Sequence, residues 1–114
     1  MSTDNSNRRH NRVPLDLYIN KIVGDEPRLV RTRDISESGL YLYKLLEPEL
    51  EGEFVGLEMK LPNADDVIWA VGQIVREEKP GDGLAIRFVR IAAADRKVIS
   101  DYIATAPAGA TAAA

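Results

Sequence analysis

Two short polar segments of this 114-residue chain carry the side chains best suited to bind a ligand. The first, residues 8–12, reads RRHNR, and the second, residues 34–39, reads DISESG. Arginine presents a planar fork of donors that matches a phosphate group and a flat face that stacks on a base. A carboxylate accepts paired N–H donors, and a hydroxyl adds a further hydrogen bond. The two segments therefore indicate a local site for an anionic ligand.

Each segment also has a plain structural interpretation when it is taken alone. Aspartate and serine hydrogen-bond the local backbone in turns, and glycine tolerates positive φ and a close approach of another group. A short basic run is usually solvated. It is the occurrence of both segments in one chain, about twenty residues apart, that favours a binding function.

The residues around these segments alternate between apolar and polar, as half-buried β-strands do. Strand-like runs lie at residues 13–20, 28–34, 40–45, 55–61, 67–77 and 83–88. Residues 24–27 and 80–83 read as turns, and residues 34–39 form a strand-to-strand turn. The run 67–77 is apolar on both faces in its first half, which predicts a strand covered on both sides. Trp69 is accordingly expected in the core or in the barrel wall.

The periodicity changes near the end of the chain. Residues 93–104 carry an apolar stripe at helical spacing, and Asp95 lies in the first turn, where a helix dipole favours an acid. One short amphipathic helix is therefore expected. Residues 1–7 are polar and predict a disordered tail, and residues 105–114 are rich in alanine and predict a mobile one. The folded domain is expected to span residues 8–104.

Six strands joined by short turns and followed by one helix indicate a mainly β protein, a closed or nearly closed antiparallel barrel. An OB-like or SH3-like barrel shares this pattern. The R-x-x-x-R of residues 8–12, followed by the D-x-S-x-x-G of residues 34–39, resembles the PilZ domain, the bacterial receptor module for cyclic di-GMP. The resemblance runs from Arg8 to about Ile103, although Ala85 stands where family members often carry a second glycine. It implies a six-stranded antiparallel PilZ-type β-barrel with a C-terminal α-helix.

The same resemblance implies that the ligand is cyclic di-GMP. The residues that it places in the binding site are Arg8, Arg9, Arg12, Asp34, Ser36 and Gly39. Arg8 and Arg12 would grip phosphate and guanine, with Arg9 assisting. Asp34 would accept the N1–H and N2–H donors of guanine, with Ser36 adding a hydroxyl bond. Adenine presents an acceptor at N1 instead, so a carboxylate at this place is expected to select guanine.

Composition excludes several other classes of site and partner. The chain has no cysteine and a single histidine, His10, so we expect no disulfide, no metal site and no cofactor. A net charge of −3 and seven aromatic residues argue against DNA or RNA as the partner. No apolar run approaches the ~20 residues of a membrane helix, and none resembles a signal peptide. We therefore expect a cytoplasmic protein without membrane insertion.

The function expected is that of a receptor or adaptor and not of an enzyme. Its N-terminal arm is expected to change conformation over the ligand, and the signal to pass to an unidentified downstream protein that controls motility, adhesion or exopolysaccharide. The sequence is compatible with a monomer or a ligand-dependent dimer. The alternative is a PilZ-like interaction protein that does not bind cyclic di-GMP and acts by protein contact alone. A small barrel that binds single-stranded nucleic acid is the least favoured.

Overall fold

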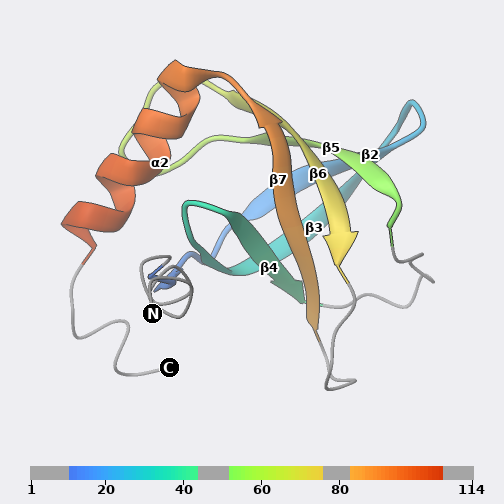
Figure 1. The fold of residues 1–114 in the computed structure, drawn as a ribbon, viewed down its shortest axis with the longest axis horizontal. Helices are drawn as coiled ribbons and strands as arrows, with labels where there is room; N and C mark the ends of the chain where they lie inside the picture. Colours follow the sequence, from blue (N-terminus) through green and yellow to red (C-terminus); the bar gives the residue numbers. More distant parts are fainter. Residues whose placement is uncertain (1–10, 44–51, 76–82, 107–114) are drawn as a thin grey trace, which may run out of the picture.

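The structure is a computed structural model that describes residues 11–43, 52–75 and 83–106. Within these ranges the chain forms seven strands and one helix (Figure 1). Their bounds are β1 Val13–Pro14, β2 Tyr18–Val23, β3 Glu26–Ile35, β4 Gly39–Tyr43, β5 Phe54–Met59, β6 Ile68–Val75, β7 Gly83–Ile91 and α2 Ala93–Thr105. The predicted tail at residues 1–7 and most of the one at 105–114 lie outside the described residues.

Six of the strands close into an antiparallel barrel, as the sequence predicts. The order is β3-β2-β5-β6-β7-β4, and a further pairing of β3 with β4 completes the ring. The seventh strand, β1, pairs only with the end of β3 and lies outside the ring. The expected first strand at residues 13–20 is thus divided into β1 and the start of β2, which pair with successive parts of β3.

The barrel interior is filled by alternate residues from all six strands, as the two-residue period of a strand requires. Its most deeply buried apolar side chains include Ile35, Leu40, Leu42 and Leu57. In the predicted alternation of residues 13–20, Val13, Leu15 and Ile19 are buried and Leu17 is half-buried against the core. The hairpin turn expected after β2 is a two-residue loop, in which Gly24 has a φ of +66°. A positive φ is unstrained only for glycine.

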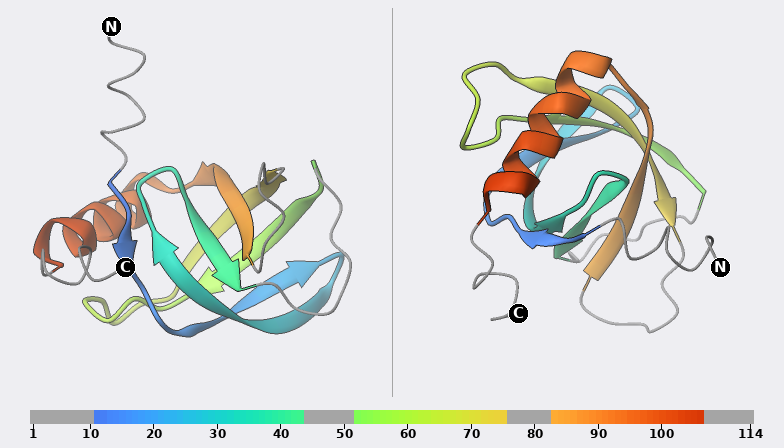
Figure 2. Two further views of the ribbon diagram at one scale, coloured as in Figure 1. Left: turned by 90° about the horizontal axis from the view of Figure 1, so that it is seen from below. Right: turned by 60° about the vertical axis from the view of Figure 1, so that its left-hand side comes forward.

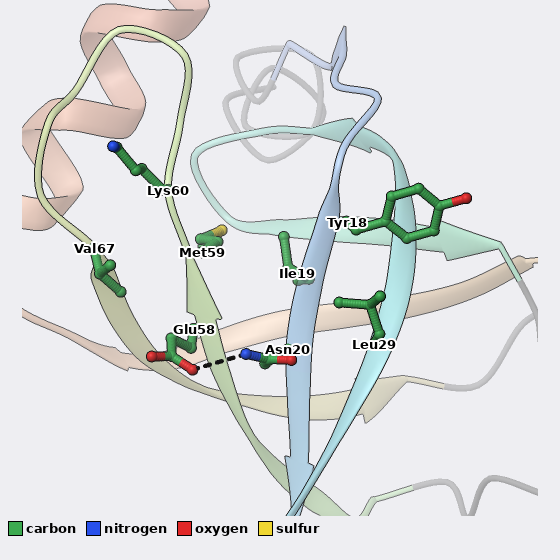
Figure 3. Close-up of a pocket in the computed structure, with 8 residues that line it drawn as sticks. All are labelled: Tyr18, Ile19, Asn20, Leu29, Glu58, Met59, Lys60 and Val67. Atoms are coloured by element: carbon green, nitrogen blue, oxygen red, sulfur yellow. Dashed lines mark hydrogen bonds between the residues drawn. The ribbon is translucent and has the colours of Figure 1, made fainter.

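The expectation that the strand around Trp69 is covered on both faces is wrong. In β6, Ile68, Ala70 and Ile74 point into the core, but the Trp69 side chain is 55% exposed on the outer wall. The outer wall nearby carries a shallow hollow of about 200 Å³, in which Asn20 Nδ2 donates to Glu58 Oε1 at 3.0 Å (Figure 3). The first half of β6 is therefore apolar on both sides without being covered on both.

Helix α2 packs beside the barrel (Figures 1 and 2). Its Ile99 side chain is fully buried, and Asp95 lies in its first turn, as predicted. The Tyr102 hydroxyl donates to the Pro14 carbonyl at 2.9 Å, which ties the helix to β1 across 88 residues of sequence. Since β1 also pairs with the end of β3, the helix supports the part of the barrel that carries the second polar segment.

Candidate binding site

A β-bulge in β3 aims Asp34 at the outside of the barrel. Opposite β4, Thr32 pairs with Leu42 and Asp34 pairs with Tyr41, so Arg33 is an extra residue with no partner of its own in the strand register. Thr32 and Ile35 are both completely buried although they stand three positions apart. A regular strand would send these two side chains to opposite faces. The bulge absorbs the extra residue and leaves the Asp34 side chain 16% exposed beside the exposed Arg33.

Ser36 begins the loop between β3 and β4 and holds it together. Its hydroxyl is buried, accepts the Ser38 backbone N–H at 3.2 Å and lies 3.0 Å from the Ser38 hydroxyl. The backbone N–H of Ser36 donates to the Gly39 carbonyl at 2.8 Å, which closes the loop. The strand-to-strand turn predicted at residues 34–39 is thus confirmed, with Ser36 as its central hydrogen-bonding group.

Gly39 is required by the neighbouring strand, for a reason that the sequence did not reveal. Its φ is not positive, and a Cβ at this position would lie 2.1 Å from the Ile86 carbonyl oxygen and 3.0 Å from Arg87 Cα. The absent side chain therefore allows β4 to approach β7. The close-approach interpretation of this glycine holds, but the group that approaches is a strand of the same chain.

Arg12 joins the two polar segments, which the sequence separates by 22 positions. Its Nε donates to Asp34 Oδ1 at 2.7 Å, and its Nη1 donates to the Ser36 hydroxyl at 3.4 Å. β1 makes this possible, because Val13 and Pro14 pair with Ile35 and Asp34 and bring Arg12 beside the bulge. Three of the six predicted site residues thus meet. Gly39 follows the same loop as the first residue of β4, whereas Arg8 and Arg9 lie outside the described residues.

A second arginine also contacts Asp34, and the sequence pattern did not assign it to the site. Arg33 Nε donates to Asp34 Oδ2 at 3.0 Å, and its guanidinium lies 3.7 Å from the centre of the Tyr41 ring. Both oxygens of Asp34 therefore accept from an arginine. Arg33 and Asp34 are adjacent in the sequence, and adjacent residues of a regular strand face opposite ways, so the strand pattern did not predict this pairing.

A hollow of about 160 Å³ lies on the other side of Arg12. It is lined by Arg12, Ser38, Gly39, Val75, Ala85, Ile86 and Arg87. Arg87 is the cross-strand partner of Gly39 and donates to Gln73 Oε1. The hollow is therefore lined by two arginines, which suits an anionic group. Arg87 is a second lining residue that the predicted site does not include.

The chemistry of the site is that of arginines, one carboxylate, hydroxyls and backbone. Among the described residues, no group of three or more His, Cys, Asp or Glu side chains is placed to hold a metal ion. In the same part of the chain, no helix has the length and apolar character needed to span a membrane.

The sequence matches the family model of the PilZ domain over residues 6–105. The chain belongs to the PilZ domain family. The match spans the barrel, both polar segments and α2, so it confirms the family resemblance carried by residues 8–12 and 34–39. A comparison with curated protein sequences finds no match.

Solved structures with the same fold include two PilZ-family proteins. The Bacillus subtilis inhibitor of motility (MotI/DgrA) superposes with a TM-score of 0.71 at 20% identity, covering 83% of this chain and 48% of its own. The Borreliella burgdorferi PlzA protein, solved in complex with c-di-GMP, gives a TM-score of 0.61 at 14% identity, covering 89% of this chain and 44% of its own. The PilZ chain thus spans about half the length of either relative.

Proposed function

We propose that this PilZ chain is a receptor for cyclic di-GMP, bound by Arg8, Arg9, Arg12, Asp34, Ser36 and Gly39. The observation that carries the proposal is the contact of Arg12 with both Asp34 and Ser36. The barrel thus brings a cation to a carboxylate and a hydroxyl that follow it by more than twenty positions in the sequence. The family match and the c-di-GMP complex of PlzA support the same ligand.

Asp34 is the group that would read the guanine base. A carboxylate offers about four lone-pair directions, and the two arginine contacts occupy one on each oxygen. Its remaining lone pairs can accept the N1–H and N2–H donors of guanine. An adenine would present its N1 lone pair to the same carboxylate, and two acceptors repel. Asp34 therefore favours guanine over adenine.

The arginines would hold the phosphodiester groups and stack on the bases. Arg12 is 43% exposed and lies between Asp34 and the hollow that Arg87 also lines, so its fork can turn from the carboxylate to a ligand phosphate. Arg8 and Arg9 precede it and would close over the ligand from the N-terminal side. The main contribution of Ser36 and Gly39 to this site is to fix the shape of the loop that follows Asp34 and contains Ser38.

In this proposal the protein acts as an adaptor and not as an enzyme, and it needs no cofactor. Binding reorders the segment before β1, and the changed surface is read by a downstream protein that controls motility, adhesion or exopolysaccharide. The likeness to MotI, an inhibitor of motility, supports the first of these outputs. The proposed setting is the cytoplasm, with the protein as a monomer or a ligand-dependent dimer.

Isothermal titration calorimetry with cyclic di-GMP, and with cyclic di-AMP for comparison, tests the proposal. We expect saturable binding that prefers the guanine ligand. Each bidentate contact is worth ~1–3 kcal/mol, so Arg12→Ala and Asp34→Ala should each weaken binding roughly 5- to 150-fold. Arg28→Ala is a matched control, because Arg28 is a partly exposed arginine of β3 on the far side of Arg31 from the site.

The alternative, a PilZ protein that acts by contact alone, gives a different result in the same experiment. The folded wild-type chain would then release no heat with either dinucleotide. If the Arg12→Ala variant bound cyclic di-GMP with unchanged affinity, the ligand would be confirmed, but Arg12 would not belong to the binding site. The stoichiometry of a positive titration distinguishes one bound molecule from an intercalated pair.

A further inference from the structure

The contact between Arg33 and Asp34 exists only because β3 is bulged between Thr32 and Asp34. Consecutive side chains of a regular strand point to opposite faces of the sheet. Here Arg33 Nε lies 3.0 Å from Asp34 Oδ2, so both side chains lie on the outer side of the barrel. A bulge that re-aims a side chain in this way is typical of the surroundings of a binding site.

Arg33 is itself held by an aromatic platform on the neighbouring strand. Its guanidinium lies over the ring of Tyr41, the residue that pairs with Asp34 across β3 and β4. The Tyr41 ring in turn packs on Gly83 of β7, where a Cβ would lie 1.7 Å from a ring carbon. Gly83, Tyr41, Arg33 and Asp34 thus form a continuous chain of contacts that ends at the carboxylate.

The two arginines that contact Asp34 differ in how they are anchored. Arg12 immediately precedes β1, a strand of only two residues. Arg33 belongs to the ten-residue strand β3 and rests on Tyr41. When Arg12 turns toward a ligand phosphate, Asp34 loses the partner of Oδ1 but keeps the partner of Oδ2. The orientation of the carboxylate during binding then depends on Arg33.

We propose that Arg33 is the positioning residue that sets guanine selectivity, by fixing the plane of the Asp34 carboxylate on the Tyr41 platform. The inference rests on the proposed function and deepens it. A carboxylate held in one orientation presents its remaining lone pairs to the N1–H and N2–H donors without first losing rotational freedom. Cyclic di-AMP lacks these two donors, so the loss of Arg33 should change the affinity for cyclic di-GMP more than the affinity for cyclic di-AMP.

The chain offers a closely matched control for Arg33. Arg31 lies two positions earlier on β3 and also points outward, and its Nε donates to Asp16 Oδ1 at 2.8 Å. Its guanidinium lies 5.1 Å from the centre of the Tyr43 ring. Each arginine thus contacts a carboxylate and a tyrosine ring. Replacing either removes the same charge from the same strand, but of the two only Arg33 contacts Asp34.

The test is calorimetric titration of the wild-type, Arg33→Ala and Arg31→Ala chains with cyclic di-GMP and cyclic di-AMP. Because the Arg33 side chain is 42% exposed, we expect Arg33→Ala to weaken cyclic di-GMP binding by about 2- to 5-fold. The preference for guanine should fall by a similar factor. Arg31→Ala should leave the ratio of the two affinities unchanged.

A measurement without ligand tests the clamp itself. The arginine Nε–H signals of the wild-type and Asp34→Asn chains are compared by nitrogen-edited NMR, and solvent exchange should become faster at Arg33 but not at Arg31. Unchanged exchange at Arg33 would overturn the positioning role. If the wild-type chain binds cyclic di-GMP selectively, two further results would overturn the positioning role. One is full guanine selectivity in the Arg33→Ala variant, and the other is an equal loss of selectivity in the Arg31→Ala variant. A wild-type chain that binds neither ligand would instead overturn the proposed function, and the selectivity role with it.

Discussion

Replacing Gly39 with alanine should destabilise the barrel, and the size of the effect follows from the packing of β4 on β7. The new Cβ would lie 2.1 Å from the Ile86 carbonyl oxygen and 3.0 Å from Arg87 Cα, both of which are backbone atoms. Carbon–oxygen contacts between strands settle near ~3.3–3.6 Å, so the two strands must separate locally by roughly 1 Å. A hydrogen bond of ordinary length does not survive that displacement.

Two backbone hydrogen bonds depend directly on the position of Gly39. The Phe88 N–H donates to the Ser38 carbonyl at 2.8 Å, and the Ser36 N–H donates to the Gly39 carbonyl at 2.8 Å. Losing both costs about 2 kcal/mol, and overpacking adds about 1 kcal/mol more. The lower entropy of the unfolded alanine chain offsets roughly 0.5 kcal/mol. The free energy of unfolding should therefore fall by about 2–3 kcal/mol, which lowers Tm by roughly 8–20 °C in a domain of this size.

Urea unfolding followed by circular dichroism measures this loss. Gly56→Ala is the matched control, because Gly56 is also a strand glycine but the nearest atom to its new Cβ would be Ile22 Cβ at 3.3 Å, a much milder overlap than the 2.1 Å at Gly39. Its effect should stay below about 1 kcal/mol. If Gly39→Ala unfolds at the wild-type urea concentration and yet loses cyclic di-GMP binding, the glycine makes room for the ligand and not for β7, and the packing argument fails.

Three further predictions concern Tyr102 of α2 and the ion pair between Asp16 and Arg31. Tyr102→Phe removes the hydrogen bond from α2 to the Pro14 carbonyl and should lower the free energy of unfolding by about 1 kcal/mol, measured in urea. Burial raises the pKa of Tyr102, so its ultraviolet titration should lie above that of free tyrosine, and a normal midpoint would contradict the buried contact. The hydrogen bond from Arg31 holds the pKa of Asp16 below its usual range. The ion pair thus stabilises the fold at pH values above the pKa of an aspartate in the unfolded chain, and this stabilisation is lost as the pH falls through the lower pKa of folded Asp16. A carbon-detected NMR titration should show that the pKa of Asp16 rises in the Arg31→Ala variant.

The sequence was sufficient to predict a six-stranded barrel, its C-terminal helix and the family, although it did not separate β1 from β2. The period of two identified the strands, and the change of period after residue 92 identified α2, because these patterns arise within each element. The two polar segments were recognisable for the same reason: their residue types and spacing are local. The PilZ resemblance that these segments carry assigned Arg12, Asp34 and Ser36 to one site, and the structure brings the three side chains into contact.

The tertiary structure decided the features that depend on a second strand. The bulge at Arg33 is a mismatch of register between β3 and β4, and neither strand specifies it alone. The role of Gly39 depends on the approach of β7, which lies more than forty positions further along the chain. Trp69 lies in an apolar run, yet whether its outer face is covered depends on where α2 packs, and the helix does not cover it. Alternation tells which side chains share a face of a strand, whereas pairing between distant strands decides what that face meets.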